Sequence, residues 1–347
     1  MRSPEPPSSP WQLLYGGAHR LRRRWYRTRA RRLPRPVVSV GNLCWGGAGK
    51  TPVTAAVAAH LRDRGLAVCI LSRGYAGRGR GVRVVSLGEG PLLGPLLAGD
   101  EPVLLAGELP GVAVVVGPDR WQAGQQALRR LPEPPDLFLL DDGFSHLALH
   151  RDLDLVVFPA ADPFAGGRLL PSGRLREPLA AVARAHAVLL TGAAPEALDT
   201  AGAALAAALR PHGFAGPGFA SRTVPGRPRP VGGGGDLGDL ATGARVFLVS
   251  AVARPAGFTA LVRDLGFAIA GELRFPDHHA YPPASLARLE AACRDSGAAA
   301  VLTTAKDGVK LLGRLAVPLV ELPIRAEPEP AFWAWLDEAV DRLAGRG

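Results

Sequence analysis

The chain has 347 residues, of which 47% are hydrophobic, so it can bury a large core and favours two domains. Its three cysteines, Cys44, Cys69 and Cys293, show neither a metal-binding spacing nor a disulfide framework, which suits a reducing compartment and excludes a disulfide-rich secreted domain. No apolar run is long enough to span a membrane. No signal peptide is expected, because the N-terminal charges follow the weakly apolar stretch instead of preceding it.

The formal net charge of +10 is concentrated near the N-terminus. Residues 20–32 contain eight arginines and no acid, so the rest of the chain is nearly balanced in charge and we expect no nucleic acid as a partner. Apolar residues recur at helical spacing in and before this run, namely Trp11, Leu14, Tyr15, Ala18, Leu21 and Trp25. Residues 1–35 are therefore predicted to form a basic amphipathic arm on an anionic membrane surface. A solvated basic tail and an RNA-contacting arm are the alternatives.

A strand, a glycine-rich loop and a helix are predicted after the arm. Residues 36–40, PVVSV, are apolar and β-branched and indicate a buried strand. Residues 41–49, GNLCWGGAG, then turn the chain, and from Thr51 apolar residues recur at helical spacing. Strand, glycine loop, Lys-Thr pair and helix, in this order, are the context that a phosphate-binding loop requires.

This loop is predicted to bind phosphate groups. Its backbone N–H groups would present partial positive charge to phosphate oxygens, and the Thr51 hydroxyl would lie on Mg²⁺. Lys50 is one of three lysines among 41 lysines and arginines, the others being Lys306 and Lys310, which indicates that a compact ammonium is needed there. The strict motif has Gly at the position of Cys44, so the match covers its second half. The predicted nucleotide-binding residues of the loop are Cys44, Trp45, Gly46, Gly47, Ala48, Gly49, Lys50 and Thr51.

Strands and helices alternate through the next part of the chain. Apolar runs predict strands at 67–71, 112–116, 136–140, 153–158 and 187–190, with a helix at 119–130. This alternation indicates an α/β fold with a parallel sheet that is covered on both faces and binds ligands at the carboxyl ends of its strands. Asp141 and Asp142 fall at such an end and are predicted Mg²⁺ ligands, with a turn or helix-capping role as the alternative.

A Pro/Gly-rich stretch separates this unit from a second one. The predicted organisation is a P-loop domain at 36–215, a junction at 216–240 and a second α/β lobe at 241–347. The second lobe is expected to contain strands at 244–250, 299–303 and 317–322 and helices at 255–265, 283–295 and 330–343. The last of these helices is amphipathic and could pack on the first lobe.

Two acidic segments are candidates for a catalytic base. Asp100 precedes a helical run, where helix capping is the alternative to a catalytic role. Asp277, His278 and His279 lie together in the second lobe. Two adjacent histidines do not readily bind one metal, and no third ligand is nearby, so a carboxylate–histidine base is more plausible than a zinc site.

Seven sequence motifs occur in order between about residues 36 and 310. They are VSVGNLCWGGAGKTP, LSRGY, GDEP, DDGFSH followed by RDLDL, GRLREP, FPDHHAY and LTTAKD. Together they resemble the tetraacyldisaccharide 4'-kinase family, the lipid A 4'-kinases. The resemblance implies two α/β/α lobes joined by a short linker, with the P-loop in the first. It also implies a peripheral enzyme at the cytoplasmic face of the inner membrane, which transfers the γ-phosphate of ATP, with Mg²⁺, to the 4'-hydroxyl of a lipid A disaccharide precursor.

The resemblance assigns roles to several residues. Lys50 and Thr51 would serve phosphate and Mg²⁺, and Arg176 would contact phosphate. The residues expected near the metal or the phosphates are Asp141, Asp142 and Glu177.

By the same resemblance, Asp100 and His278 would act on the acceptor hydroxyl. His278 is favoured over His279, because the family's spacing puts the functional histidine directly after the aspartate. Two residues depart from the family pattern, which usually has Gln at Ser145 and Glu at Ala305. The second departure leaves the placement of the neighbouring lysine open.

Two other functions share part of this pattern. One is a membrane-docked P-loop ATPase that acts as a nucleotide switch, and the other is a P-loop kinase for a soluble metabolite. A nucleotide switch does not require the base predicted at 275–281, which argues against the first alternative. A kinase for a soluble metabolite does not require a membrane-binding arm, which argues against the second.

Overall fold

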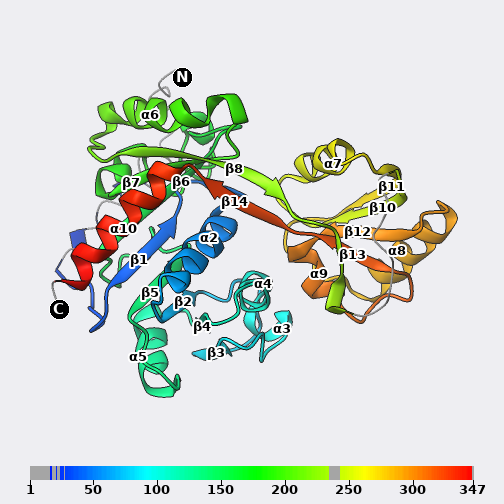
Figure 1. Cartoon of the computed structure of the whole chain (residues 1–347), viewed down its shortest axis with the longest axis horizontal. Coiled ribbons are helices and arrows are strands. Elements are labelled where there is room, and N and C mark those ends of the chain that lie inside the picture. Colours follow the sequence, from blue (N-terminus) through cyan, green and yellow to red (C-terminus); the bar gives the residue numbers. More distant parts are fainter. Residues whose placement is uncertain (1–15, 18–20, 22–23, 27, 234–242, 346–347) are drawn as a thin grey trace.

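The computed structural model describes residues 16–17, 21, 24–26, 28–233 and 243–345. It contains a nine-stranded sheet and a five-stranded sheet, which form the centres of what we call the first and second lobes (Figure 1). The fold is α/β, as predicted, and most strands of both sheets are parallel.

The nine-stranded sheet has the order β14-β8-β7-β6-β1-β5-β2-β4-β3. Its strands are β1 (Val37–Gly41), β2 (Val68–Ser72), β3 (Arg83–Ser86), β4 (Ala113–Val116), β5 (Leu137–Asp141), β6 (Leu153–Pro159), β7 (Ala187–Thr191), β8 (Gly218–Pro225) and β14 (Ile324–Pro328). The central strands are buried along their whole length, which explains why the sequence shows near-continuous apolar runs there. β3 and β14 close the two edges as antiparallel strands.

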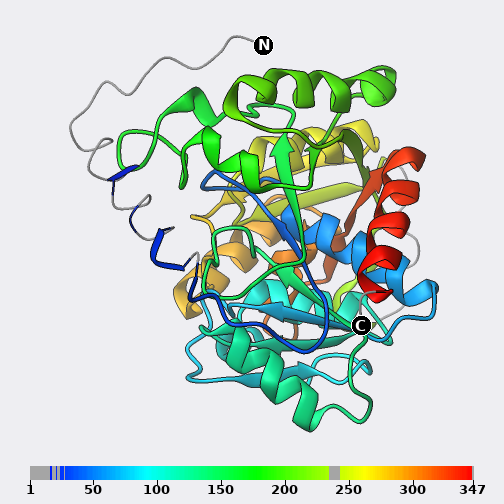
Figure 2. The same ribbon diagram turned by 90° about the vertical axis from the view of Figure 1, so that its left-hand side faces the viewer.

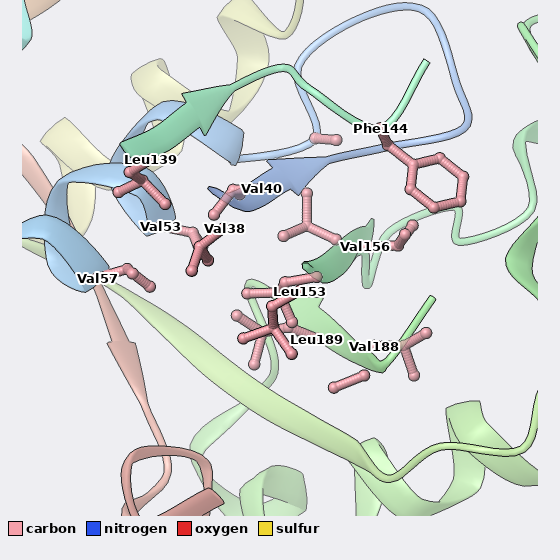
Figure 3. Packing of buried hydrophobic residues seen from close by; sticks show 14 of the residues in the cluster. Val38, Val40, Val53, Val57, Leu139, Phe144, Leu153, Val156, Val188 and Leu189 are labelled. Carbon is pink, nitrogen blue, oxygen red and sulfur yellow. The ribbon is translucent and has the colours of Figure 1, made fainter. Parts of the chain in front are cut away.

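Helices cover both faces of this sheet. They are α2 (Lys50–Asp63), α3 (Pro95–Ala98), α4 (Asp100–Glu108), α5 (Arg120–Arg130), α6 (Leu198–Leu209) and α10 (Pro330–Ala344), with short 3₁₀ turns at 165–167, 179–184, 195–197 and 210–212. Figure 3 shows part of the larger core, in which Val53 and Val57 of α2 approach Val38, Val40 and Leu139 of the sheet. The smaller core on the other face includes Ala123 and Ala127 of α5.

The five-stranded sheet has the order β11-β10-β12-β13-β9. Its elements are β9 (Arg229–Pro230), β10 (Arg245–Ser250), β11 (Ala268–Arg274), β12 (Ala300–Thr304), β13 (Leu319–Leu322), a 3₁₀ turn at 231–233, α7 (Pro255–Asp264), α8 (Pro283–Asp295) and α9 (Ala305–Leu311). Two apolar clusters, one on each face, form its core. α9 begins at Ala305, where the side chain of Thr304 caps the helix by accepting a hydrogen bond from Asp307 N.

The junction between the lobes differs from the predicted range 216–240. Residues 218–225 of that range form β8, which pairs in parallel with β7 and antiparallel with β14. Figure 1 shows β8 and β14 running together from the first lobe towards the second. The composition was misleading here because β8 has Gly and Pro at its ends, whereas Phe219, Ala220 and Ser221 inside it are buried. The other domain limits stay predictions.

The last helix, α10, packs on the first lobe. Its residues Phe332, Leu336, Ala339 and Val340 belong to the larger core of that lobe. Figure 2 shows α10 (red) beside α2 (blue), and the rings of His60 and Trp333 stack between them with centroids 4.4 Å apart. The C-terminal segment thus returns to the first lobe after the second lobe is complete.

Replacing Phe332 with alanine is expected to destabilise the first lobe by about 3–5 kcal/mol, the usual cost of truncating a buried aromatic residue. Phe332 is fully buried, and its ring lies 5.6 Å from that of Phe219. Urea unfolding would measure the change. Leu92→Ala is the control, because Leu92 is 60% exposed and should change the free energy of unfolding by less than about 0.5 kcal/mol. A loss below about 1 kcal/mol for Phe332→Ala would show that α10 does not contribute to this core.

Most of the predicted N-terminal arm lies outside the described residues, including Trp11, Leu14, Tyr15 and Ala18. Of the described residues, Leu21 is 72% exposed and Trp25 is 57% exposed. The end of the arm contacts the first lobe, because Arg31 N donates to Ala148 O and Leu33 packs in the smaller core. In the part of the chain that the structure describes, no helix is long and apolar enough to cross a membrane.

Candidate active site

The glycine-rich loop lies between the carboxyl end of β1 and the first turn of α2. Gly49 precedes the helix with φ of 75°, a left-handed conformation that favours glycine. The Thr191 hydroxyl at the end of β7 donates to Ala48 O at 2.9 Å and so fixes the loop to the sheet. A Cβ added at Gly47 would lie 3.7 Å from Ala253 Cβ, so the second lobe approaches the loop.

Residues 174–176 support the first half of the loop. Trp45 N donates to Arg174 O at 2.6 Å, and Arg176 N donates to Leu43 O at 2.7 Å. Cys44, at the position where the strict motif has Gly, is buried and forms an isolated bridge with Leu175. This pairing places the Arg176 guanidinium 5.7 Å from the centre of the Trp45 ring, beside the phosphate-binding loop.

Asp142 connects the two cations of the loop region. Lys50 Nζ lies 3.8 Å from one of its carboxylate oxygens, and Arg176 Nη1 donates to the other at 2.8 Å. Burial alone would raise the pKa of Asp142, but Lys50 and Arg176 outweigh it and lower the pKa. Asp142 also has a left-handed backbone, with φ of 56°, which is uncommon for a residue with a side chain. The structure thus brings together Lys50, Arg176 and Asp142, which the sequence placed in one site.

Asp141 is the buried neighbour of this group. It is 1% exposed and accepts a hydrogen bond from the Thr54 hydroxyl at 3.1 Å. Burial and the negative charges of Glu101 and Asp142 raise the pKa of Asp141 to about 7. A buried carboxyl group whose pKa is raised by neighbouring carboxylates, close to Lys50 of the glycine-rich loop, fits a divalent cation. Among the described residues, no group of three or more His, Cys, Asp and Glu side chains could hold a metal, so Thr51 and phosphate oxygens would have to complete the coordination.

Glu177 has partners of its own. Its Oε1 accepts a hydrogen bond from Ser145 Oγ at 2.6 Å, and its Oε2 accepts one from Arg184 Nη2 at 2.8 Å. Ser145 therefore supplies a hydrogen-bond donor to this carboxylate. A metal-binding role for Glu177 stays a prediction.

Asp100 and His278 meet across the two lobes. Asp100 is the first residue of α4 and is 3% exposed, and its two carboxylate oxygens lie 3.1 and 3.0 Å from His278 Nδ1. His278 has φ of 60°, so the chain holds this imidazole on a left-handed backbone. His279 points elsewhere, because its ring stacks on Phe275 and its Nε2 lies 2.9 Å from Ser285 Oγ.

The charge on Asp100 is set by cations of the second lobe. Burial would raise the pKa of its carboxyl, but the hydrogen bond to His278 and the nearby Lys306 and Lys310 outweigh burial and lower the pKa. Lys310 Nζ lies 3.6 Å from Asp100 and 2.8 Å from Asp307. The carboxylate is therefore unprotonated at neutral pH.

Two residues of this site were not predicted from the sequence. Glu101 lies next to Asp100 and contacts Lys306 at 3.1 Å. Arg120 opens α5 and is 5% exposed, and its Nε has no hydrogen-bond partner in the described part of the chain. Burial and the positive charge of Arg73 lower the pKa of Arg120 to about 10. The negative charges of Asp142 and Asp141 act in the opposite direction but are outweighed. The sequence could have indicated Arg120 by its position shortly after a predicted strand, as it did for Asp141.

Comparison with known proteins identifies the family. The family model of the tetraacyldisaccharide-1-P 4'-kinases matches residues 8–341. A tetraacyldisaccharide 4'-kinase of Pelobacter propionicus is 43% identical over 310 residues, which cover 88% of this chain and 82% of that protein. One of Geobacter sulfurreducens is 40% identical over 344 residues, which cover 95% of this chain and 91% of that protein.

A solved structure supports the same assignment. The crystal structure of the "apo" form of LpxK from Aquifex aeolicus, in complex with ATP, matches with a TM-score of 0.74 and 31% sequence identity. The match covers 96% of this chain and 97% of that one, so both lobes are included. The chain belongs to the tetraacyldisaccharide-1-P 4'-kinase family.

Proposed function

We propose that this chain transfers the γ-phosphate of ATP to the 4'-hydroxyl of a tetraacyldisaccharide 1-phosphate, on the cytoplasmic face of the inner membrane. The observation that carries the proposal is the Asp100–His278 pair, in which a buried carboxylate of the first lobe, the lobe that holds the glycine-rich loop, contacts an imidazole of the second lobe. A phosphoryl transfer to a hydroxyl needs both parts, a site for the phosphates and a group that accepts the hydroxyl proton. Family membership supports the choice of acceptor.

The loop side of the site would hold the nucleotide. Lys50 and the backbone N–H groups of residues 46–51 would offset charge on the β- and γ-phosphates, with Arg176 beside them. Thr51, Asp141 and Asp142 would hold Mg²⁺, which when bound supplies further charge neutralisation and helps to fix the phosphates. Transfer of phosphate depends on such positioning more than on covalent chemistry.

Asp100 and His278 would form the acceptor side of the site, where the sugar hydroxyl loses its proton. Asp100 is unprotonated at neutral pH, so it can accept the proton of the sugar hydroxyl as the hydroxyl attacks. His278 would orient the Asp100 carboxylate through Nδ1. Because the two groups come from different lobes, closure of the lobes would complete the site and exclude water.

The test is transfer of label from γ-labelled ATP. The proposal predicts label in the lipid when the protein is incubated with a tetraacyldisaccharide 1-phosphate and Mg²⁺, and none when Mg²⁺ is removed by chelation. A nucleotide switch would release labelled inorganic phosphate at the same slow rate with or without the lipid. A kinase for a soluble metabolite would leave the lipid unlabelled.

Deleting residues 1–27 is expected to release the protein from anionic vesicles. The arm combines arginines, each worth at most about 1 kcal/mol near an anionic surface, with the exposed apolar residues Leu21 and Trp25. This deletion keeps Arg31 and Leu33, whose contacts with the first lobe support its stability. Co-sedimentation with phosphatidylglycerol vesicles would measure binding, with phosphatidylcholine vesicles as the control.

The same deletion should raise the apparent KM for acceptor in a bilayer more than for acceptor in detergent. Binding of the full chain should weaken as the salt concentration rises from about 0.05 to about 0.5 M, because the Debye length falls about threefold. If the shortened protein sediments with anionic vesicles as well as the full chain does, the arm is not the anchor.

A further inference from the structure

Lys306 joins the two lobes directly beside the Asp100–His278 pair. It lies on α9, and its Nζ is 3.1 Å from Glu101 Oε1 of the first lobe, 3.3 Å from Asp277 Oδ1 and 3.2 Å from His278 Nε2. Its side chain is 17% exposed. One ammonium thus has three acceptor atoms within hydrogen-bond distance, one of them the far nitrogen of the histidine that contacts Asp100.

The contact with His278 fixes where the imidazole proton lies. A lysine ammonium has three N–H donors and no acceptor, so in a hydrogen bond between these two groups His278 Nε2 accepts and carries no proton. The single proton of a neutral imidazole is then on Nδ1, the atom 3.0 Å from Asp100 Oδ2. His278 therefore donates to Asp100 and leaves the carboxylate negative.

We propose that Lys306 is a positioning residue that keeps His278 neutral, with its proton on Nδ1, so that Asp100 remains free to accept the proton of the acceptor hydroxyl. This inference rests on the proposed role of Asp100 in the transfer reaction. A doubly protonated imidazole would place a full positive charge against Asp100 and weaken it as a base.

The charges around His278 explain why a cation is needed at this place. Asp100 faces Nδ1, and Asp277 lies 3.8 Å from Nε2, so two carboxylates lie against the ring. Two cations balance these carboxylates. Lys306 contacts Nε2, and Lys310 contacts Asp100. Two further titratable groups among the described residues are Glu101, which pairs with Lys306, and Tyr75, whose ring meets the imidazole edge-on at 4.9 Å.

Lys306 carries the positive charge that disfavours a second proton on the imidazole of His278. Burial would lower its pKa, but the carboxylates of Glu101, Asp100 and Asp277 outweigh burial and raise it. The ammonium is therefore charged throughout the pH range in which histidine titrates. Its acidic partner from the opposite lobe is Glu101, whose Oε1 lies 3.1 Å from Nζ.

The first test is the pH dependence of kcat for Lys306→Met, which keeps the length of the side chain but removes its charge. Without the ammonium, His278 should take up a second proton at higher pH, so the acidic limb of the kcat profile should move up by about one unit or more. The loss of kcat should be about tenfold or more at pH 6.5 and should shrink to within about threefold of the unchanged protein at pH 9. The KM for ATP should change little.

A merely structural role predicts a different result. If Lys306 only holds the lobes together, the loss of kcat will be the same at every pH, and this outcome or an unchanged kcat would overturn the proposal. Arg294→Met is the matched control. Arg294 is a second-lobe cation whose side chain is 59% exposed and lies 3.8 Å from Glu290, so its loss should not move the pH profile.

The second test needs neither the acceptor lipid nor an active variant. Nitrogen-15 NMR of the histidine side chains in the full chain at pH 7 should show His278 neutral with its proton on Nδ1, assigned by comparison with His278→Gln. A proton on Nε2, or on both nitrogens, would overturn the proposal even if the kinase activity is as expected. Failure of lipid phosphorylation alone, with the predicted tautomer present, would instead refute the proposed function.

Discussion

Replacing Lys50 with alanine is expected to abolish phosphate transfer and to leave the fold intact. Lys50 is the first residue of α2, and its Nζ lies 3.8 Å from Asp142, with no contribution to either apolar core of the first lobe. Its loss removes the cation expected at the β- and γ-phosphates. The measurement is kcat with the lipid acceptor, together with circular dichroism to confirm folding.

Lys50→Arg should fail as well. The guanidinium is a planar fork and cannot replace the compact ammonium that lies 3.8 Å from Asp142 beside the loop. Arg62→Ala is the control and should keep near-normal activity, because Arg62 lies in the last turn of the same helix and pairs with Asp63. If Lys50→Arg retains near-normal kcat, the assignment of this loop to the phosphates is wrong.

Replacing Asp100 with alanine should lower kcat by about 10²–10⁴, the usual contribution of a positioned general base. The KM for ATP should change little, because Asp100 belongs to the acceptor side of the site. His278→Ala should cost as much or less, and the double variant should lose less than the product of the two losses, because the groups act as a unit. Steady-state kinetics with both substrates would measure these effects.

His279→Ala provides the matched control for this pair. The side chain of His279 contacts Phe275 and Ser285 and lies away from Asp100, so its loss should leave kcat within a few-fold. Full independence of the Asp100 and His278 losses would show that the two residues do not cooperate. A larger loss from His279→Ala than from His278→Ala would assign the role to the neighbouring residue.

The elements that the sequence predicts well are those determined by local pattern. The buried strand β1, the glycine loop and α2 follow one another in the chain, so apolar runs, glycines and helical spacing are enough to place them. Three strands of the second lobe, β10, β12 and β13, were predicted within about two residues for the same reason, whereas β11 was not predicted. Position at the carboxyl ends of parallel strands also brought Asp141 and Asp142 to the loop, as expected.

Contacts between residues far apart in the chain cannot be predicted from local sequence pattern. β8 and β14 pair with each other although about 100 residues separate them, and the composition around β8 resembles a linker. Lys306 stands out in the sequence as one of three lysines. Its contact with Glu101 cannot be predicted from the sequence, because it depends on how the lobes face each other. The buried position of Arg120 likewise follows from the packing of α5 against the sheet and not from its neighbours in the chain.

The most direct test of the account is the product formed from a synthetic tetraacyldisaccharide 1-phosphate and ATP. Mass spectrometry and phosphorus-31 NMR should show a second phosphate at the 4' position, with one ATP consumed for each bisphosphate formed. The 4'-deoxy analogue of the acceptor should give no phosphorylated product and no increase in ATP consumption. ATP consumption without a bisphosphate product, or phosphate at another hydroxyl, would contradict the account.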